Sequence, residues 1–194
     1  MESHRHRFRY FFKAAFVAFL LGATSCALPH PARSDANFEL PAHATYEVIF
    51  SPTMQAEQAI IRFIQDAQKS VHVAAYSFTS RPIAQALLEA RARGLDVRVV
   101  VDKSQASGRY SAATFLANQA VSVRVDGEYQ LQHQKVVIVD GVSVETGSYN
   151  FTASARDRNS ENVIIIRNAP ALAARYEENW EKMWGESVVM EMRY

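Results

Sequence analysis

The chain has 194 residues, 48% of them hydrophobic, and its 21 Lys and Arg residues nearly balance its 20 Asp and Glu residues. This balance excludes a uniformly basic surface, so a polyanionic partner would have to be held by a local patch of positive charge. Cys26 is the one cysteine, which excludes an intrachain disulfide, and the fold must therefore rest on its hydrophobic core.

Residues 1–27 have the order of a secretory signal peptide. Basic residues precede an apolar run from Ala14 to Leu21, and Ser25-Cys26-Ala27 offers the small residues of a cleavage site. The run is much shorter than the roughly 20 residues that a spanning helix needs. We therefore expect cleavage after Ala27, a periplasmic or secreted protein, and no stable membrane span afterwards. In the alternative, Cys26 becomes the lipidated first residue of a lipoprotein.

The rest of the chain is long enough for one domain. Without the leader, 17 basic and 19 acidic residues remain over about 167 positions. Residues 28–44 contain prolines and no hydrophobic period, which predicts a linker. We expect the domain over residues 45–186 and a C-terminal tail over 187–194.

Strands and helices are predicted to alternate from residue 46. Strands are expected at 46–50, 71–75, 96–101 and 121–125, and helices at 56–67, 81–93 and 110–118. Gly94 is placed to end the second helix. This rhythm predicts an α/β fold, an α/β/α layered sandwich around a mixed, largely parallel sheet. A further strand is expected at 161–166, and a last helix at 169–185 whose aromatic stripe should pack in the core.

A hairpin is predicted between two strands at 131–139 and 142–148. Only Asp140-Gly141 separates them, and such a pair favours a two-residue turn because both positions need positive φ. Opposed residues, and residues two apart, share a face of the sheet. The predicted register pairs Val139 with Val142, Lys135 with Thr146, and His133 with Ser148. It would bring His133, Lys135, Ser148 and Asn150 to one face.

This group combines an imidazole, a fixed cation and neutral hydrogen-bond donors. It lacks the carboxylate, imidazole or thiolate clusters that divalent metals require. The donors could hold phosphate oxygens while the imidazole attacks phosphorus or moves a proton. The pattern therefore indicates phosphoryl transfer with no metal and no other cofactor.

Two motifs in this region resemble a known signature. The first consists of His133-Gln134-Lys135, four further residues and Asp140, and the second is Gly147-Ser148-Tyr149-Asn150. They resemble the H-x-K-x4-D and G-S-x-N motifs of the phospholipase D superfamily. The likeness extends over about residues 46–185 and is greatest to the small, single-motif, secreted or periplasmic nuclease branch. Gln134 stands where many members have a second histidine.

The resemblance implies roles for five residues. His133 would be the nucleophile that forms a phosphohistidine, and Lys135 and Asn150 would bind the phosphate oxygens. Ser148 would add a hydrogen bond, and Glu161 would accept a proton from the other imidazole nitrogen and orient the ring.

Other motif positions are expected to be structural. Asp140 matches the family's aspartate, but its place in the turn predicts a structural role, and Gly147 belongs to the motif's framework. His72 is expected to be a satisfied core or edge histidine, and Tyr76 and Asp102 are expected to be structural.

The family mechanism needs two histidines, whereas this chain has one motif copy. We therefore expect a homodimer whose two His133 side chains share one site across the two-fold axis. Such a cleft could also gather both copies of Lys135, and of Arg109, Arg156 and Arg158, around a nucleic acid substrate. Residues 156–158 could equally form an ordinary solvated loop.

The function expected from these features is a non-specific endonuclease acting on DNA, or on RNA as well. One alternative is a phospholipase D-type phospholipid hydrolase or transphosphatidylase. Another is an exported binding domain without enzymatic activity.

Overall fold

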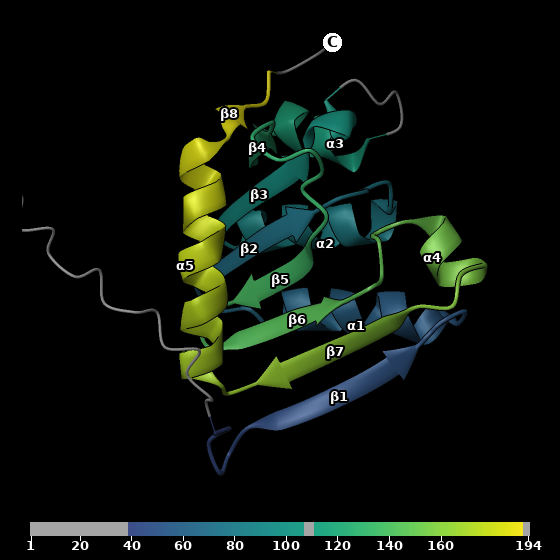
Figure 1. Ribbon diagram of the computed structural model, residues 1–194, viewed down its shortest axis with the longest axis vertical. Coiled ribbons are helices and arrows are strands. Elements are labelled where there is room, and N and C mark those ends of the chain that lie inside the picture. Colours follow the sequence, from purple (N-terminus) through teal and green to yellow (C-terminus); the bar gives the residue numbers. More distant parts are fainter. Residues whose placement is uncertain (1–38, 107–110, 192–194) are drawn as a thin grey trace, which may run out of the picture. The chain divides into compact units, whose positions relative to one another are not determined.

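The computed structural model describes residues 39–106 and 111–191, which build one eight-stranded sheet in the order β1-β7-β6-β5-β2-β3-β4-β8 (Figure 1). The signal peptide, Cys26, most of the predicted linker and Arg109 lie outside these residues. The strands are β1 Thr45–Phe50, β2 Ser70–Ala75, β3 Asp96–Asp102, β4 Ser122–Asp126, β5 Lys135–Val139, β6 Ser143–Gly147, β7 Asn162–Arg167 and β8 Val188–Val189. The helices are α1 Met54–Gln65, α2 Arg81–Ala92, the short 3-10 helix η1 Lys103–Gln105, α3 Ala112–Asn118, α4 Ala153–Asp157 and α5 Pro170–Glu186.

The sheet is mixed, as predicted, but its parallel part is smaller than expected. Parallel pairing joins β2 to β3 and β3 to β4, where helices form the crossovers. The other five pairings of the described strands are antiparallel. The strands after Gly127 follow short connections, whereas a parallel pair needs a long crossover between its strands. These strands therefore pair antiparallel.

Helices cover both faces of the sheet, which confirms the α/β/α sandwich. In Figure 1, α5 crosses one face while α1 and α2 lie behind the sheet. Apolar residues of α1, α2 and α3 pack with Val73, Val99 and Val137 in one core cluster. On the other face, Trp180 and Met183 of α5 pack in a second cluster against the sheet. The aromatic stripe of this helix is therefore core, as expected, and the Trp180 indole donates to the Val73 carbonyl at 2.9 Å.

The β5–β6 hairpin has the predicted turn residues in a different register. Asp140 and Gly141 both have positive φ, at 56° and 66°. The Val142 N–H donates to the Val139 carbonyl at 3.1 Å, yet Val139 pairs with Ser143. The loop therefore holds one more residue than predicted.

This shift of one residue changes which side chains share a face. Thr146 pairs with Val136, so the predicted pairing of Lys135 with Thr146 is wrong. Glu145 instead lies opposite Val137 and faces the core under α1.

The ends of several elements also differ from prediction. β5 begins at Lys135, so His133 lies in an irregular segment, not in a strand. Residues after 186 are not simply a tail, because Val188–Val189 pairs with β4 and Met190 is buried. Within the described part of the chain, no helix has the length and apolar character to cross a bilayer.

Candidate active site

The segment that carries His133 is fixed by backbone contacts at the carboxyl ends of β2 and β3. The Gln132 N–H donates to a carboxylate oxygen of Asp102 at 2.8 Å, and the Tyr76 N–H donates to the Gln134 carbonyl at 3.0 Å. Gln132 is almost fully buried, whereas His133 is exposed. The segment is thus anchored on both sides of a histidine that faces solvent.

Lys135 is buried directly beside this histidine. Its ammonium donates to the His133 carbonyl at 2.7 Å and lies 3.2 Å from Nδ1 of the ring. Only 5% of Lys135 is exposed, and this burial lowers the pKa of its amine, while the negative charge of Glu161 acts in the opposite direction. A buried ammonium with few partners is well placed to bind an anion.

Ser148 and Glu161 meet through the junction of β6 and β7. The Ser148 hydroxyl donates to Glu161 Oε2 at 2.6 Å and accepts the Asn162 N–H at 3.1 Å. Asn159 donates to the other oxygen of Glu161 at 2.8 Å. Both hydrogen bonds to this carboxylate therefore come from residues other than His133, so its predicted role in orienting the ring stays a prediction.

Gly147 permits this close junction. A β-carbon at Gly147 would collide with the backbone carbonyl of Asn162. The Ser148 N–H donates to that carbonyl at 3.1 Å and to the Asn162 side chain at 2.8 Å. Only a residue without a side chain allows the two strands to approach this closely.

Asn150 lies in the loop that follows Ser148. The next residue, Phe151, donates its N–H to the Ser77 carbonyl at 3.1 Å, which holds the loop against the end of β2. The Asn150 Oδ1 atom is buried and has no hydrogen-bond partner among the described residues. An unsatisfied buried amide of this kind has capacity for a polar ligand.

Comparisons with known proteins show the family of the chain. Residues 60–184 match the family model described as "Cardiolipin synthase, PLD-like domain". The chain belongs to the phospholipase D family. It is 32% identical over 187 residues to "Phospholipase D" of Rickettsia bellii, covering 87% of this chain and 92% of the relative.

Other similar proteins include a lipid hydrolase and a solved family structure. The "Mitochondrial cardiolipin hydrolase" of Xenopus tropicalis is 31% identical over 134 residues, which cover 69% of this chain and 63% of the relative. The crystal structure of the phospholipase D family member Nuc from Salmonella typhimurium has 38% identity and a TM-score of 0.73, and covers 77% of this chain and 99% of that one. The chain is thus a phospholipase D family phosphodiesterase.

Tyr76 touches this candidate site, although the sequence predicted only a structural role. Its ring lies 4.5 Å from the His133 ring, centroid to centroid, and the Lys135 ammonium lies 5.1 Å from the Tyr76 ring centre. An aromatic residue directly after β2, at the strand end where the site forms, was the available signal. Tyr76 limits the orientations open to the exposed imidazole.

Asp102 shapes the site from beneath. It is buried at the end of β3, and its carboxylate accepts the N–H groups of Ser104 at 2.9 Å and Gln132 at 2.8 Å. Burial raises the pKa of this carboxyl, but these hydrogen bonds outweigh burial and the pKa is lowered. The Asp102 carboxylate is therefore a structural anchor for the His133 segment.

The remaining predicted residues that the structure describes are Asp140, Arg156 and Arg158. Asp140 is at the opposite end of β5 from His133, where its carboxylate accepts the N–H groups of residues 68–70 at 2.7–3.1 Å. Arg156 forms ion pairs with its neighbour Asp157 at 2.7 Å and with Glu57 at 3.1 Å, and the second of these joins α4 to α1. Arg158 is exposed directly after α4.

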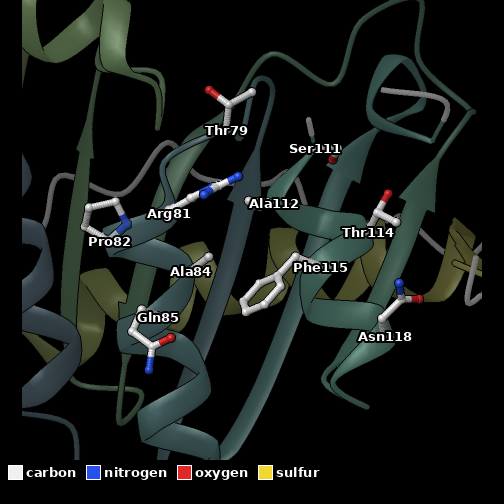
Figure 2. A pocket seen from close by; sticks show the side chains of 10 residues that line it. All are labelled: Thr79, Arg81, Pro82, Ala84, Gln85, Ser111, Ala112, Thr114, Phe115 and Asn118. Atoms are coloured by element: carbon white, nitrogen blue, oxygen red, sulfur yellow. The ribbon is translucent and has the colours of Figure 1, made fainter. Parts of the chain in front are cut away.

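A cavity of about 960 Å³ lies between α2 and α3 (Figure 2). Its lining includes Thr79, Arg81 and Phe115, and it is mostly apolar. The lining contains neither His133 nor Lys135.

Proposed function

We propose that this chain is an endonuclease that hydrolyses DNA without a metal or other cofactor, through a phosphohistidine at His133. The observation that carries the proposal is an exposed imidazole next to the buried Lys135 ammonium. The charge of Glu161, which is hydrogen-bonded to Ser148, acts on this ammonium. The resemblance of a single, short motif copy to the small nuclease branch supports DNA as the substrate.

The proposed reaction has two displacements at phosphorus. Nε2 of His133 attacks, a P–N bond forms, and the bond to the leaving ester oxygen breaks as that oxygen takes a proton. A water molecule then attacks phosphorus, gives up a proton, and the P–N bond breaks. Lys135 and Asn150 stabilise the negative charge on the other phosphate oxygens.

Substrate binding must rearrange one contact of the free protein. The Lys135 ammonium now faces Nδ1 of His133. When a phosphate enters, we expect the ammonium to turn toward its oxygens. The ring proton would then move from Nε2 to Nδ1, which donates it to Glu161 as the resemblance implies, and Nε2 would be left unprotonated for its attack.

The proton for the leaving oxygen would come from a second His133 in a homodimer. An exposed apolar patch supports this shared site. Tyr46, Val48 and Phe50 are exposed and alternate along edge strand β1, so they share one face. Phe50 pairs with Asn162, which bonds to Ser148, so the patch reaches the catalytic residues.

A lipid phosphodiester is the second candidate substrate. The names of the relatives, "Phospholipase D" and "Mitochondrial cardiolipin hydrolase", favour it. A lipid reaction would use the same His133 chemistry with a different leaving group.

The test incubates the purified chain with plasmid DNA in excess EDTA, beside vesicles of phosphatidylcholine and cardiolipin. His133→Asn should lower DNA cleavage by about three orders of magnitude, as loss of a nucleophile does. His43→Asn is the matched control, because His43 is exposed and precedes the first strand. Loss of DNA cleavage in EDTA, or full activity of His133→Asn, would overturn the mechanism. Lipid turnover without DNA cleavage would select the second candidate.

The shared site has its own test. Phe50→Glu places a charge in the apolar patch and should convert the dimer to a monomer in analytical ultracentrifugation, with loss of activity. A wild-type protein that is fully active as a monomer would overturn the shared site.

A further inference from the structure

His72 occupies the central strand β2 and faces α5, on the opposite side of the sheet from Lys135. It pairs across the strands with Ile138, which belongs to the core cluster under α5. Only 7% of His72 is exposed, and its ring stacks on Trp180 with centroids 4.4 Å apart. The side chain is therefore fixed in the core, away from the phosphodiesterase site.

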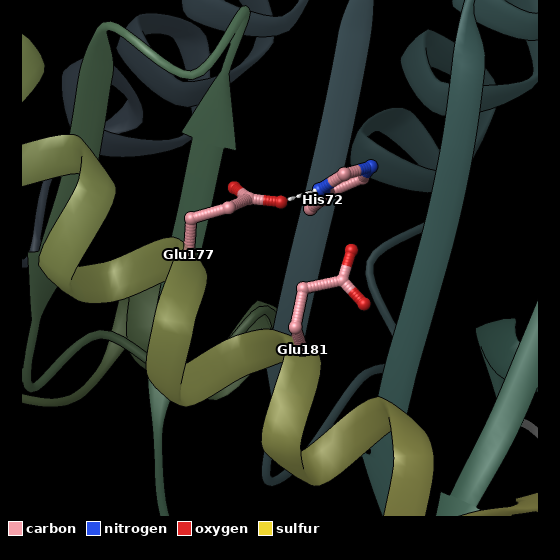
Figure 3. A group of neighbouring side chains, drawn as sticks. All are labelled: His72, Glu177 and Glu181. Atoms are coloured by element: carbon pink, nitrogen blue, oxygen red, sulfur yellow. Dashed lines mark hydrogen bonds and ion pairs between the residues drawn. The ribbon is translucent and has the colours of Figure 1, made fainter.

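Two carboxylates of α5 converge on this imidazole. Nδ1 of His72 contacts Glu177, and Glu181 lies one helical turn further on (Figure 3). One nitrogen or oxygen from each of the three residues lies within 4.8 Å of the others. The Glu181 side chain is 49% exposed, so a change of rotamer can bring its carboxylate closer.

The other nitrogen of the ring also has the surroundings of a metal ligand. Nε2 of His72 lies 3.6 Å from a carboxylate oxygen of Asp96 and makes no hydrogen bond within the described part of the chain. A histidine that binds a metal usually directs its second nitrogen at a carboxylate, which fixes the tautomer and the ring. Asp96 is placed to do this for a ligand at Nδ1.

The charges around His72 favour a divalent cation. Glu177, Glu181 and Asp96 bring three negative charges. Their cationic partner, apart from His72 itself, is Arg98, which lies 2.7 Å from Asp96 and 3.5 Å from Glu181. With a neutral imidazole, the group has a net charge of about −2, which a divalent ion would balance.

We propose that His72, Glu177 and Glu181 bind a divalent transition ion such as Zn²⁺, with Asp96 supporting the histidine. One imidazole and two carboxylates are a donor set that zinc accepts, and water can complete a tetrahedron. The ion would join α5 to the central strand of the sheet. Its role is structural and separate from the proposed hydrolysis at His133, which needs no metal.

The test strips the purified chain with EDTA, removes the chelator, and adds Zn²⁺ during calorimetric titration and thermal unfolding. We expect a Kd in the micromolar range or below and a higher Tm with Zn²⁺, and little effect of Mg²⁺, which prefers oxygen ligands. Glu181→Gln should weaken zinc binding at least tenfold without impairing the fold, because this side chain is half exposed. Glu178→Gln, on the same helix and outside the ligand set, is the matched control.

Zinc binding at another site must be distinguished. Equal zinc affinity in Glu181→Gln and in the wild type would place the ion elsewhere and overturn the proposal. Absence of binding at 100 times the expected Kd of about 1 µM would overturn it as well. DNA cleavage by the zinc-loaded and zinc-free proteins is measured separately, so that failure of one proposal leaves the other standing.

Discussion

Glu145 should make the stability of this protein fall as the pH rises. Its side chain is fully buried in β6, and neither carboxylate oxygen has a hydrogen-bond partner among the described residues. Burial raises its pKa well above the usual value, so the folded state holds this proton where the unfolded chain releases it. The contribution of Glu145 to the free energy of unfolding is therefore complete at pH values below about 4.3, the pKa of this carboxyl in the unfolded chain. It declines as the pH rises toward the pKa in the folded state.

The size of this effect follows from linkage. One proton held only by the folded state changes the free energy of unfolding by about 1.4 kcal/mol per pH unit, over the pH range between the unfolded and the folded pKa. Glu145→Gln keeps the shape of the protonated acid and removes the titration. Urea unfolding at pH 5.5, 6.5 and 7.5 should show the variant gaining stability relative to the wild type as the pH rises.

Glu47→Gln is the matched control. Glu47 and Glu145 both pair with Ile165 and share a sheet face, but Glu47 is exposed on the edge strand. Its variant should follow the wild-type pH dependence. If the difference between Glu145→Gln and the wild type stays constant over the three pH values, Glu145 has the same pKa in both states and the reasoning is wrong.

Two further substitutions test the framework of the site. Gly147→Ala should cost about 1–3 kcal/mol and abolish activity, because the added methyl meets the Asn162 carbonyl. Gly127→Ala, which meets no atom within 4 Å, should leave chemical unfolding and activity unchanged. Tyr76→Leu should lower kcat about tenfold, with KM and stability nearly unchanged, because about 1 kcal/mol of ring and cation contacts is lost at His133. Tyr76→Phe keeps the ring and should retain activity; equal kcat in both variants would exclude the positioning role.

The hairpin shows where sequence patterning fails. Both positive φ values at Asp140 and Gly141 were predictable from the residue types, but the register was not. The predicted register matched the valines of the two strands, whereas the observed one sets Glu145 opposite Val137. Burying an unpaired carboxyl costs free energy. A prediction that pairs apolar residues across the hairpin therefore favours a register other than the observed one.

The reason given from the sequence for grouping the candidate site residues is partly wrong. The grouping of these side chains does not come from a shared strand face, because His133 precedes β5 and Ser148 follows β6. The residues meet through loops pinned by Asp102 and by the Gly147 junction, contacts between segments far apart in the sequence. Such contacts leave no periodic signal, which is also why Tyr76 was missed.

The last strand, β8, shields one edge of the sheet. β8 covers part of the outer edge of β4, so, within the described residues, β1 is the one edge strand with a full row of unpaired backbone groups. Truncation after Glu186 would open the edge at β4 too. A shortened chain could then add strands from neighbouring molecules at both edges of its sheet, so we expect it to polymerise. The longer chain can add strands at the β1 edge only.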